Sequence, residues 1–147
     1  MKKTLNSIFL VLFSLLLSFS VVACGSSDDS EAVEKTDLWE NATYTSDTVL
    51  GEGEKTLVVE VSVEGRSAKF TIKTDKSTVG EALLEHNLIA GDDGQYGMYV
   101  KEVNGITADF DVNKSYWAFY IDGEYAMTGV DKTEISDGAA YKLEYTK

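Results

Sequence analysis

The sequence contains no proline, one cysteine and one histidine among its 147 residues. A single cysteine excludes an internal disulfide framework and any CxxC metal or redox pair. A single histidine excludes zinc sites that need two or three imidazoles. Basic residues are also scarce, at 13 against 25 acidic residues, which gives a formal net charge of −12. Because this acidic excess repels phosphate backbones, nucleic acid is not expected among the partners.

The length leaves room for one folded domain, and the first 23 residues differ in composition from the rest. Residues 1–23 place Lys2 and Lys3 before a largely apolar stretch and contain no acidic residue. A basic start followed by a short apolar stretch is typical of an export signal. The stretch is short for a membrane span and is interrupted by serines. The sequence therefore predicts a signal peptide over residues 1–23.

The only cysteine, Cys24, lies directly after this stretch and is preceded by Val21, Val22 and Ala23. Small and aliphatic residues before a cysteine resemble the lipobox of bacterial lipoproteins. We therefore expect cleavage before Cys24 and lipidation of its thiol, with enough acyl chains for stable attachment. This predicts a lipoprotein anchored at the extracellular face of the cell membrane. The alternatives are a soluble secreted protein with an incidental cysteine and an uncleaved transmembrane anchor.

Residues 24–54 are rich in Ser, Thr, Gly and acidic side chains, with Lys35 as the one basic residue. They show no regular apolar period and carry too little apolar surface to offset the entropy of ordering. We therefore expect a flexible, self-repelling acidic linker. Trp39 and Tyr44 are exceptions, and the alternative is that they dock on the domain as an extra edge strand.

Residues 55–147 show clear periodicity and are expected to form the domain. Alternating apolar residues over 57–63 and 70–72 flank the turn at Glu64-Gly65 and predict a β-hairpin. Thr78 and Glu81 have the spacing of a capping box, which predicts the start of a helix. One face of that helix carries Val79, Ala82, Leu83, His86 and Ile89. The lone histidine on or beside this apolar face is interpreted as structural, and Asn87 or Gly91 supplies the helix exit.

Further strands follow the helix. After a loop over 91–95, the run 96–103 ends at the turn pair Asn104-Gly105, and the run 116–121 ends at Asp122-Gly123. Residues 116–121 are apolar on both faces, which predicts a central strand. Alternation over 141–146 predicts a last strand. One main helix and five or six strands in this order predict an α+β fold with a mixed, β-grasp-like sheet.

Five segments of this region resemble the transcobalamin-like C-terminal domain, which is common on surface lipoproteins of Gram-positive bacteria. They are Thr78-Val-Gly-Glu-Ala-Leu83, Val103-Asn-Gly-Ile-Thr107, Tyr116-Trp-Ala-Phe-Tyr-Ile-Asp-Gly-Glu124, Gly129-Val130 and Ser136-Asp-Gly138. The resemblance covers about residues 56–146. It implies a β-grasp domain that binds a small ligand, with cobalamin or a related corrinoid as the candidate. In vitamin carriers of this type a separate α-helical barrel completes the pocket, so the resemblance also implies a second binding subunit or a vitamin transporter as partner.

The ligand-binding residues implied by the resemblance lie on the aromatic strand and the loop that follows it, with other aromatic or soft side chains as possible contacts. The candidates are Tyr99, Tyr116, Trp117, Tyr120, Tyr125 and Met127. Trp117 is equally compatible with a core position. A protein or glycan interaction module that uses the same aromatic strand and an exposed sheet edge is the alternative function.

Metal binding is a second alternative. Asp109, Asp111 and Asn113 have the spacing that opens a calcium loop, but Lys114 replaces the expected glycine and Tyr120 the expected glutamate. The segment therefore fails as an EF-hand, and a looser site with Asp92, Asp93 or Asp122 remains open. No nucleophile elbow, phosphate loop or pair of catalytic acids is recognisable. The chain is therefore expected to be neither an enzyme nor the holder of a resident cofactor.

Overall fold

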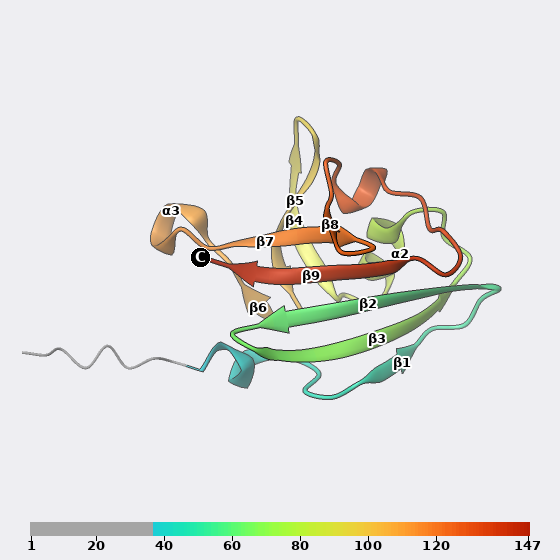
Figure 1. The fold of residues 1–147 in the computed structure, drawn as a ribbon, viewed down its shortest axis with the longest axis horizontal. Helices are drawn as coiled ribbons and strands as arrows, with labels where there is room; N and C mark the ends of the chain where they lie inside the picture. The colour runs from blue at the N-terminus through green and yellow to red at the C-terminus, as the bar shows by residue number, and fades with distance from the viewer. Residues whose placement is uncertain (1–36) are drawn as a thin grey trace, which may run out of the picture. The chain divides into compact units, whose positions relative to one another are not determined.

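The computed structural model describes residues 37–147. Its elements in chain order are the 3₁₀ turn η1 (Leu38–Asn41), β1 (Thr48–Leu50), β2 (Lys55–Val63), β3 (Arg66–Thr74), α2 (Val79–Glu85), β4 (Ile89–Gly94), β5 (Gly97–Val103), β6 (Ile106–Thr107), α3 (Phe110–Asn113), β7 (Tyr116–Ile121), β8 (Glu124–Tyr125), the 3₁₀ turn η2 (Val130–Lys132) and β9 (Ala140–Thr146). The predicted α+β fold with a mixed sheet is confirmed (Figure 1).

The main sheet has six strands in the order β1-β3-β2-β9-β7-β8. β2 and β3 form the predicted antiparallel hairpin, whose register runs from Lys55↔Thr74 to Val63↔Arg66. The apolar residues that alternate along β2 are the ones that the structure buries. Leu57, Val59, Val61 and Val63 are each at most 2% exposed. Burying a side chain of this size contributes about 1.5–3 kcal/mol, so one face of β2 anchors the core.

β9 lies parallel to β2 and antiparallel to β7, so the two central strands are β2 and β9. The expected central position of residues 116–121 is wrong for most of β7. On its other side β7 pairs only with the short β8, at Tyr120 and Ile121. The apolar character of both faces was misleading because Tyr116 and Tyr120 have apolar rings but stay partly exposed.

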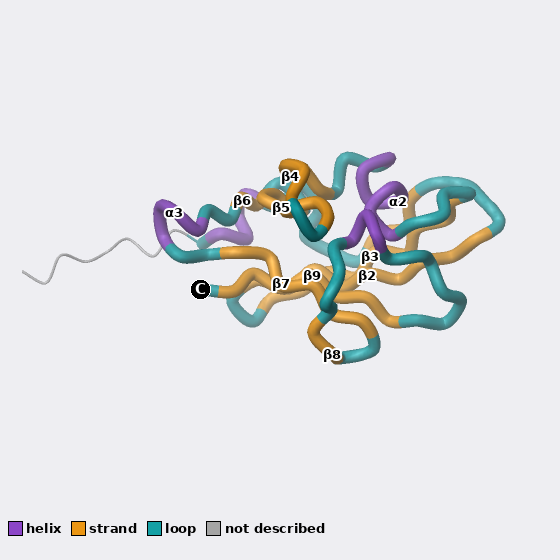
Figure 2. Tube along the Cα trace, turned by 90° about the horizontal axis from the view of Figure 1, so that it is seen from above, coloured by secondary structure: helices purple, strands orange, loops and turns teal. Residues whose placement is uncertain are grey.

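A second layer covers one face of the main sheet (Figure 2). It consists of α2 and a three-stranded sheet in the order β4-β5-β6. β4 occupies much of the loop expected over 91–95, and its pairing with β5 shifts register between Ala90 and Gly91. The two layers enclose one core, which includes side chains of β2, β3, α2, β5, β7 and β9.

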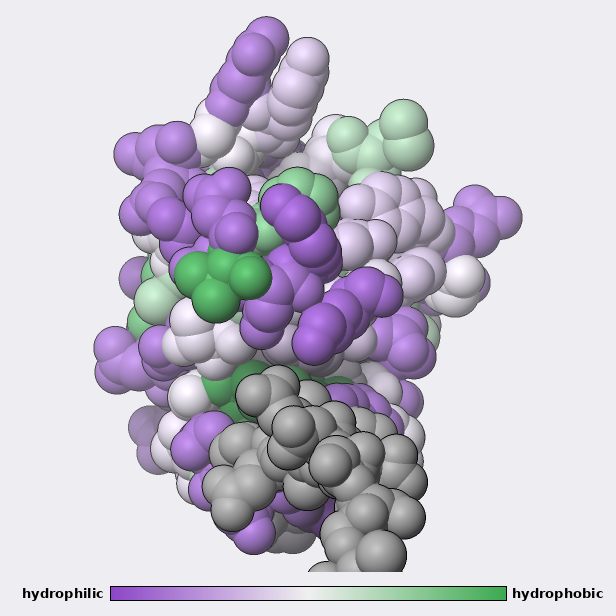
Figure 3. All heavy atoms as spheres, turned by 90° about the vertical axis from the view of Figure 1, so that its left-hand side faces the viewer, coloured by the Kyte–Doolittle hydropathy of each residue, from purple (hydrophilic) through white to green (hydrophobic). Residues whose placement is uncertain are grey.

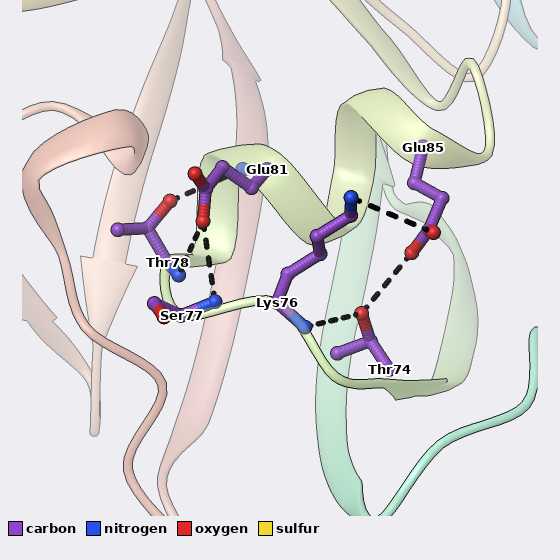
Figure 4. Close-up of polar contacts among 6 residues, drawn as sticks. All are labelled: Thr74, Lys76, Ser77, Thr78, Glu81 and Glu85. Atoms are coloured by element: carbon purple, nitrogen blue, oxygen red, sulfur yellow. Dashed lines mark hydrogen bonds and ion pairs between the residues drawn. The ribbon is translucent and has the colours of Figure 1, made fainter.

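α2 begins at the predicted capping box (Figure 4). The Thr78 hydroxyl accepts a hydrogen bond from the Glu81 amide, and the Glu81 carboxylate accepts from the Ser77 and Thr78 amides, all at 3.2 Å. The amides of Thr78 and Ser77 hold the pKa of Glu81 below its ordinary value. The helix ends at Glu85, earlier than expected, and Ile89 belongs to β4. Asn87 makes the predicted left-handed exit with φ of 52°.

The segment 37–50 belongs to the folded domain, so the expected linker boundary at residue 54 is wrong for this part. Trp39 is 7% exposed within the core, and β1 adds a parallel edge strand to β3. The ring of Tyr44 contacts that of Phe70 edge-on, with 5.7 Å between centroids. A few well-placed aromatic contacts therefore order a segment whose average composition predicts disorder.

The buried Asn104 side chain fixes this segment further. Its Oδ1 accepts from the Tyr44 amide at 2.9 Å, and its Nδ2 donates to the Tyr44 carbonyl at 2.8 Å. Asn104 lies in the predicted turn after β5 with φ of 53°.

The predicted signal peptide, Cys24 and the first part of the expected linker lie outside the described residues. Within residues 37–147, no helix is long and apolar enough to cross a membrane.

Candidate ligand-binding site

An open cavity of about 560 Å³ lies between the β4–β5 hairpin, β7, β8 and the segment that leads to η2. This volume lies within the range of small-molecule sites. Its lining is aromatic and apolar, with glycines and the polar Gln95 and Thr128, and includes no Asp, Glu, Lys or Arg. The lining residues are Gly94, Gln95, Tyr96, Gly97, Met98, Tyr99, Val100, Tyr116, Trp117, Phe119, Tyr125, Ala126, Met127, Thr128, Gly129, Val130 and Leu143.

The inner wall comes from β7, where Trp117 and Phe119 point to the same face and are 7% and 8% exposed. Neighbouring rings on β9 hold both side chains. Trp117 contacts Tyr145 edge-on at 5.7 Å between centroids, and Phe119 stacks on Tyr141 at 6.2 Å. The wall is therefore preformed by packing on the adjacent strand.

Trp117 also carries an unused hydrogen-bond donor. Its indole Nε1 is buried and has no partner within the described chain. An unpaired buried donor lowers the stability of a fold by about 1–3 kcal/mol, so such groups are rare in protein cores. The residue is thus both part of the core and part of the cavity wall.

The outer rim consists of large side chains that remain exposed. Tyr96 at the tip of the β4–β5 hairpin is 80% exposed, Tyr99 43%, Tyr125 56% and Met127 90%. Exposed aromatic and methionine side chains grouped around a cavity are typical of binding surfaces.

Asp131 of η2 joins the two sides of the cavity. Its Oδ1 accepts a hydrogen bond from the Met98 amide at 2.7 Å, which ties the β4–β5 hairpin to η2. A Cβ at Gly97 or Gly129 would lie 2.5 or 2.7 Å from this oxygen, so glycine is required at both positions for the close approach. Gly97 also has φ of 115°.

The carboxyl group of Asp131 is held in its charged form. Burial alone would raise its pKa, but hydrogen bonding from the Met98 amide and the neighbouring Lys132 outweigh burial and lower the pKa. Lys132 Nζ lies 3.4 Å from Asp131 Oδ2. At neutral pH a negative charge, paired with Lys132, therefore lies behind the cavity wall.

The structure brings five of the six predicted ligand-binding residues to this cavity, namely Tyr99, Tyr116, Trp117, Tyr125 and Met127. Tyr120 is not part of the lining. Its ring packs edge-on against Tyr125 at 5.6 Å, with Lys142 Nζ 6.0 Å from the ring centroid. Tyr120 thus supports a rim residue.

Sequence reasoning missed Gln95, Met98 and Asp131, whereas Thr128 lies in the loop after the aromatic strand that it had indicated. The available signal for the hairpin was Gly94-Gln-Tyr-Gly97, in which two glycines flank an aromatic tip. No sequence signal connects Asp131 with Met98, because the contact joins residues 33 positions apart.

The calcium-like spacing has a structural explanation. Asp109 caps α3 by accepting from the amides of Asp111 and Val112, and Asn113 accepts from the Ser115 amide. Lys114 ends the helix with φ of 64°. Asp122 accepts from the Ala140 amide at 2.9 Å. Within the part of the chain that the structure describes, no three His, Cys, Asp or Glu side chains are grouped to hold a metal ion.

A smaller cavity of about 300 Å³ lies beside α3, lined by Tyr99, Lys101, Ala108, Asp109, Phe110 and Asp111. Lys101 pairs with Asp92, and hydrogen bonding to that carboxylate raises the pKa of Lys101. The face that carries α3 and the end of β9 is mostly hydrophilic, with small separate hydrophobic patches (Figure 3).

His86 lies at the C-cap of α2, against the backbone of Gly51, and its Nε2 is buried without a partner in the described chain. It is not part of the lining of either cavity.

The fold and this cavity define the class of the protein as an α+β domain with a preformed aromatic site. Residues 76–147 match the model of a family described as a domain of unknown function, DUF4430. A crystal structure of a proposed metal binding protein from Ruminococcus gnavus is similar, with 34% identity, a TM-score of 0.60, and coverage of 64% of this chain and 98% of that chain. The chain belongs to the same family as this protein.

A structure of haptocorrin in complex with Cbi is a more distant match, at 17% identity and a TM-score of 0.44. The match covers 67% of this chain and 27% of haptocorrin, a similarity too low to bear on what this chain binds. Among curated proteins, none matches the chain.

Proposed function

We propose that the domain is a non-catalytic, extracellular binding module for a small organic ligand, held at the membrane through a lipid on Cys24. The observation that carries the proposal is the aromatic cavity, whose wall includes Trp117. A largely apolar concave site with a few polar groups is the usual form of a small-molecule site. A corrinoid is one candidate, supported by the resemblance of the sequence to transcobalamin-like domains. The module would serve as a surface receptor or deliver the ligand to a transporter.

Tryptophan fluorescence tests the proposal, because only one of the two tryptophans of the chain lines the cavity. The full-length chain with Trp39→Phe reports on Trp117 alone. Titration with cyanocobalamin, cobinamide and flat aromatic compounds should change this fluorescence saturably and raise the thermal midpoint for at least one compound. Unchanged fluorescence and midpoint with both corrinoids would remove the corrinoid form of the proposal.

Exposed rim residues separate binding from folding. Tyr96→Ala and Met127→Ala should weaken binding without changing the thermal midpoint of the free chain, since both side chains are at least 80% exposed. Val112→Ala is the matched control, because Val112 is 79% exposed and lies outside the lining of the cavity. Equal binding by all three variants would place the ligand elsewhere.

An interaction module is the second candidate, favoured by the open side of β7. The described residues pair no strand with Tyr116, Trp117 or Ala118 on that side, so a peptide of extended conformation could add a strand there. Such a partner would protect the Trp117 amide from hydrogen exchange, whereas a small ligand seated on the side chains would leave that amide exchanging.

Metal binding is supported only by the description of the relative from Ruminococcus gnavus. The carboxylates with calcium-like spacing already cap α3 and do not converge on one point, so they do not fit a metal ion. Calorimetric titration of the full-length chain with Ca²⁺ and Zn²⁺ tests this alternative, and heat that saturates at one equivalent would support it.

A further inference from the structure

We infer that the aromatic cavity selects ligands by the sign of their charge and prefers a flat organic cation to a neutral or anionic molecule of the same shape. The inference rests on the proposed function, because it assigns a ligand class to the same cavity. Three observations carry it.

The first observation is the nature of the lining. Four tyrosines and a tryptophan line the cavity, and no cationic side chain is among its lining residues. The faces of aromatic rings carry negative electrostatic potential and attract ammonium-type cations. An anion would meet these faces with no Lys or Arg from the lining to offset the repulsion.

The second observation is the carboxylate behind the wall. Asp131 Oδ1 contacts the Met98 amide and lies against Gly97 and Gly129, three residues that line the cavity. Its lowered pKa keeps it charged at neutral pH. Because little side-chain bulk separates this oxygen from the cavity, its field acts at short range.

The third observation is the balance of charge around the cavity. The elements β4, β5, β7, β8, η2 and β9 carry six acidic and three basic residues. Each of the three lysines pairs with a carboxylate, in Lys101–Asp92, Lys132–Asp131 and Lys142–Glu144. The other three carboxylates, Asp93, Glu102 and Glu124, have no ion-pair partner among the described residues. The net field around the cavity is therefore negative and favours the approach of a cation.

Three tricyclic dyes of nearly equal shape test the inference, namely proflavine as the cation, acridine as the neutral form at slightly alkaline pH, and acridine-9-carboxylate as the anion. Fluorescence titration of the full-length chain should give proflavine the lowest Kd, with about tenfold or more between cation and anion. Raising the salt concentration should narrow this difference, because exposed charges are screened.

Variants show whether the selectivity comes from the cavity. Asp131→Asn keeps an oxygen for the Met98 amide and should reduce the preference for proflavine several-fold. Glu40→Gln makes the same change of charge in η1, outside the elements that enclose the cavity, and should leave the preference unchanged. Tyr96→Ala and Met127→Ala should weaken binding of the cation at least several-fold.

Equal binding of the three dyes, or tighter binding of the anion, would overturn the inference. If that binding were still weakened by Tyr96→Ala, the proposed function would stand without charge selection. Binding of no dye, or binding insensitive to the rim variants, would overturn both the inference and the proposed site.

Discussion

Asp131 is the residue on which the shape of the cavity most depends, because among residues 37–147 its side chain supplies the hydrogen bond that joins the β4–β5 hairpin to η2. Asp131→Ala should lower the free energy of unfolding at neutral pH by about 1–2 kcal/mol, the usual contribution of a hydrogen bond to a charged group in a partly exposed position. Chemical denaturation measures this change, and Lys132→Ala is the control for loss of the ion pair alone.

The lowered pKa of Asp131 predicts how the free energy of unfolding depends on pH. Its pKa is lowered from 3.8 in the folded state, so its contribution is complete above that pH and is lost as the pH falls through the folded pKa. The difference in stability between the wild-type chain and Asp131→Asn should therefore be constant near neutrality and shrink in strong acid. A difference that grew on acidification would contradict the assignment of a charged, hydrogen-bonded carboxylate.

At the scale of elements, α2 depends on its capping box. Thr78→Ala removes the acceptor for the Glu81 amide and should lower the free energy of unfolding by about 1 kcal/mol. Ser77→Ala is the matched control, because its hydroxyl makes no hydrogen bond with any of the residues 37–147. Thermal denaturation of both variants measures the difference, and an equal effect of the two changes would argue against the cap.

The segment 37–50 depends on Asn104 in the turn between β5 and β6. Asn104→Ala removes both hydrogen bonds to the backbone of Tyr44 and leaves these partly buried groups unpaired, which should lower the free energy of unfolding by about 1–3 kcal/mol. Amides in residues 43–50 should then exchange faster with solvent. Asn41→Ala changes an exposed asparagine of the same segment and should leave the exchange rates unchanged.

These elements show what local patterns can and cannot predict. The β2–β3 hairpin and the Thr78 cap were predictable because alternation and capping act within a few residues. Asn104, 60 positions from Tyr44, could not be assigned from local patterns. The end of α2 and the start of β4 were also misplaced, since Ile89 satisfies a helical and a strand pattern equally well.

At the scale of the whole molecule, the sequence predicted many residues of the candidate site but not how the strands and turns around it are arranged. The aromatic residues of β7 and the following loop were identified from the sequence. The β4–β5 hairpin that closes the other side was not, because its approach to η2 depends on a contact across 33 residues and two glycines. Basic residues are few in the sequence, and the lysines around the cavity each pair with a carboxylate, so they do not make the cavity positive.

The central claim is that this cavity binds a small organic ligand. The most direct test is methyl NMR of the full-length chain labelled at methionine, because two of its three methionines, Met98 and Met127, line the cavity. Titration with a set of small aromatic compounds, proflavine included, should shift both methyl signals saturably, together with the amides of residues 95–99 and 125–130. Signals that stay fixed across the set, or shifts confined to the amides of 109–111 beside the smaller cavity, would contradict the claim.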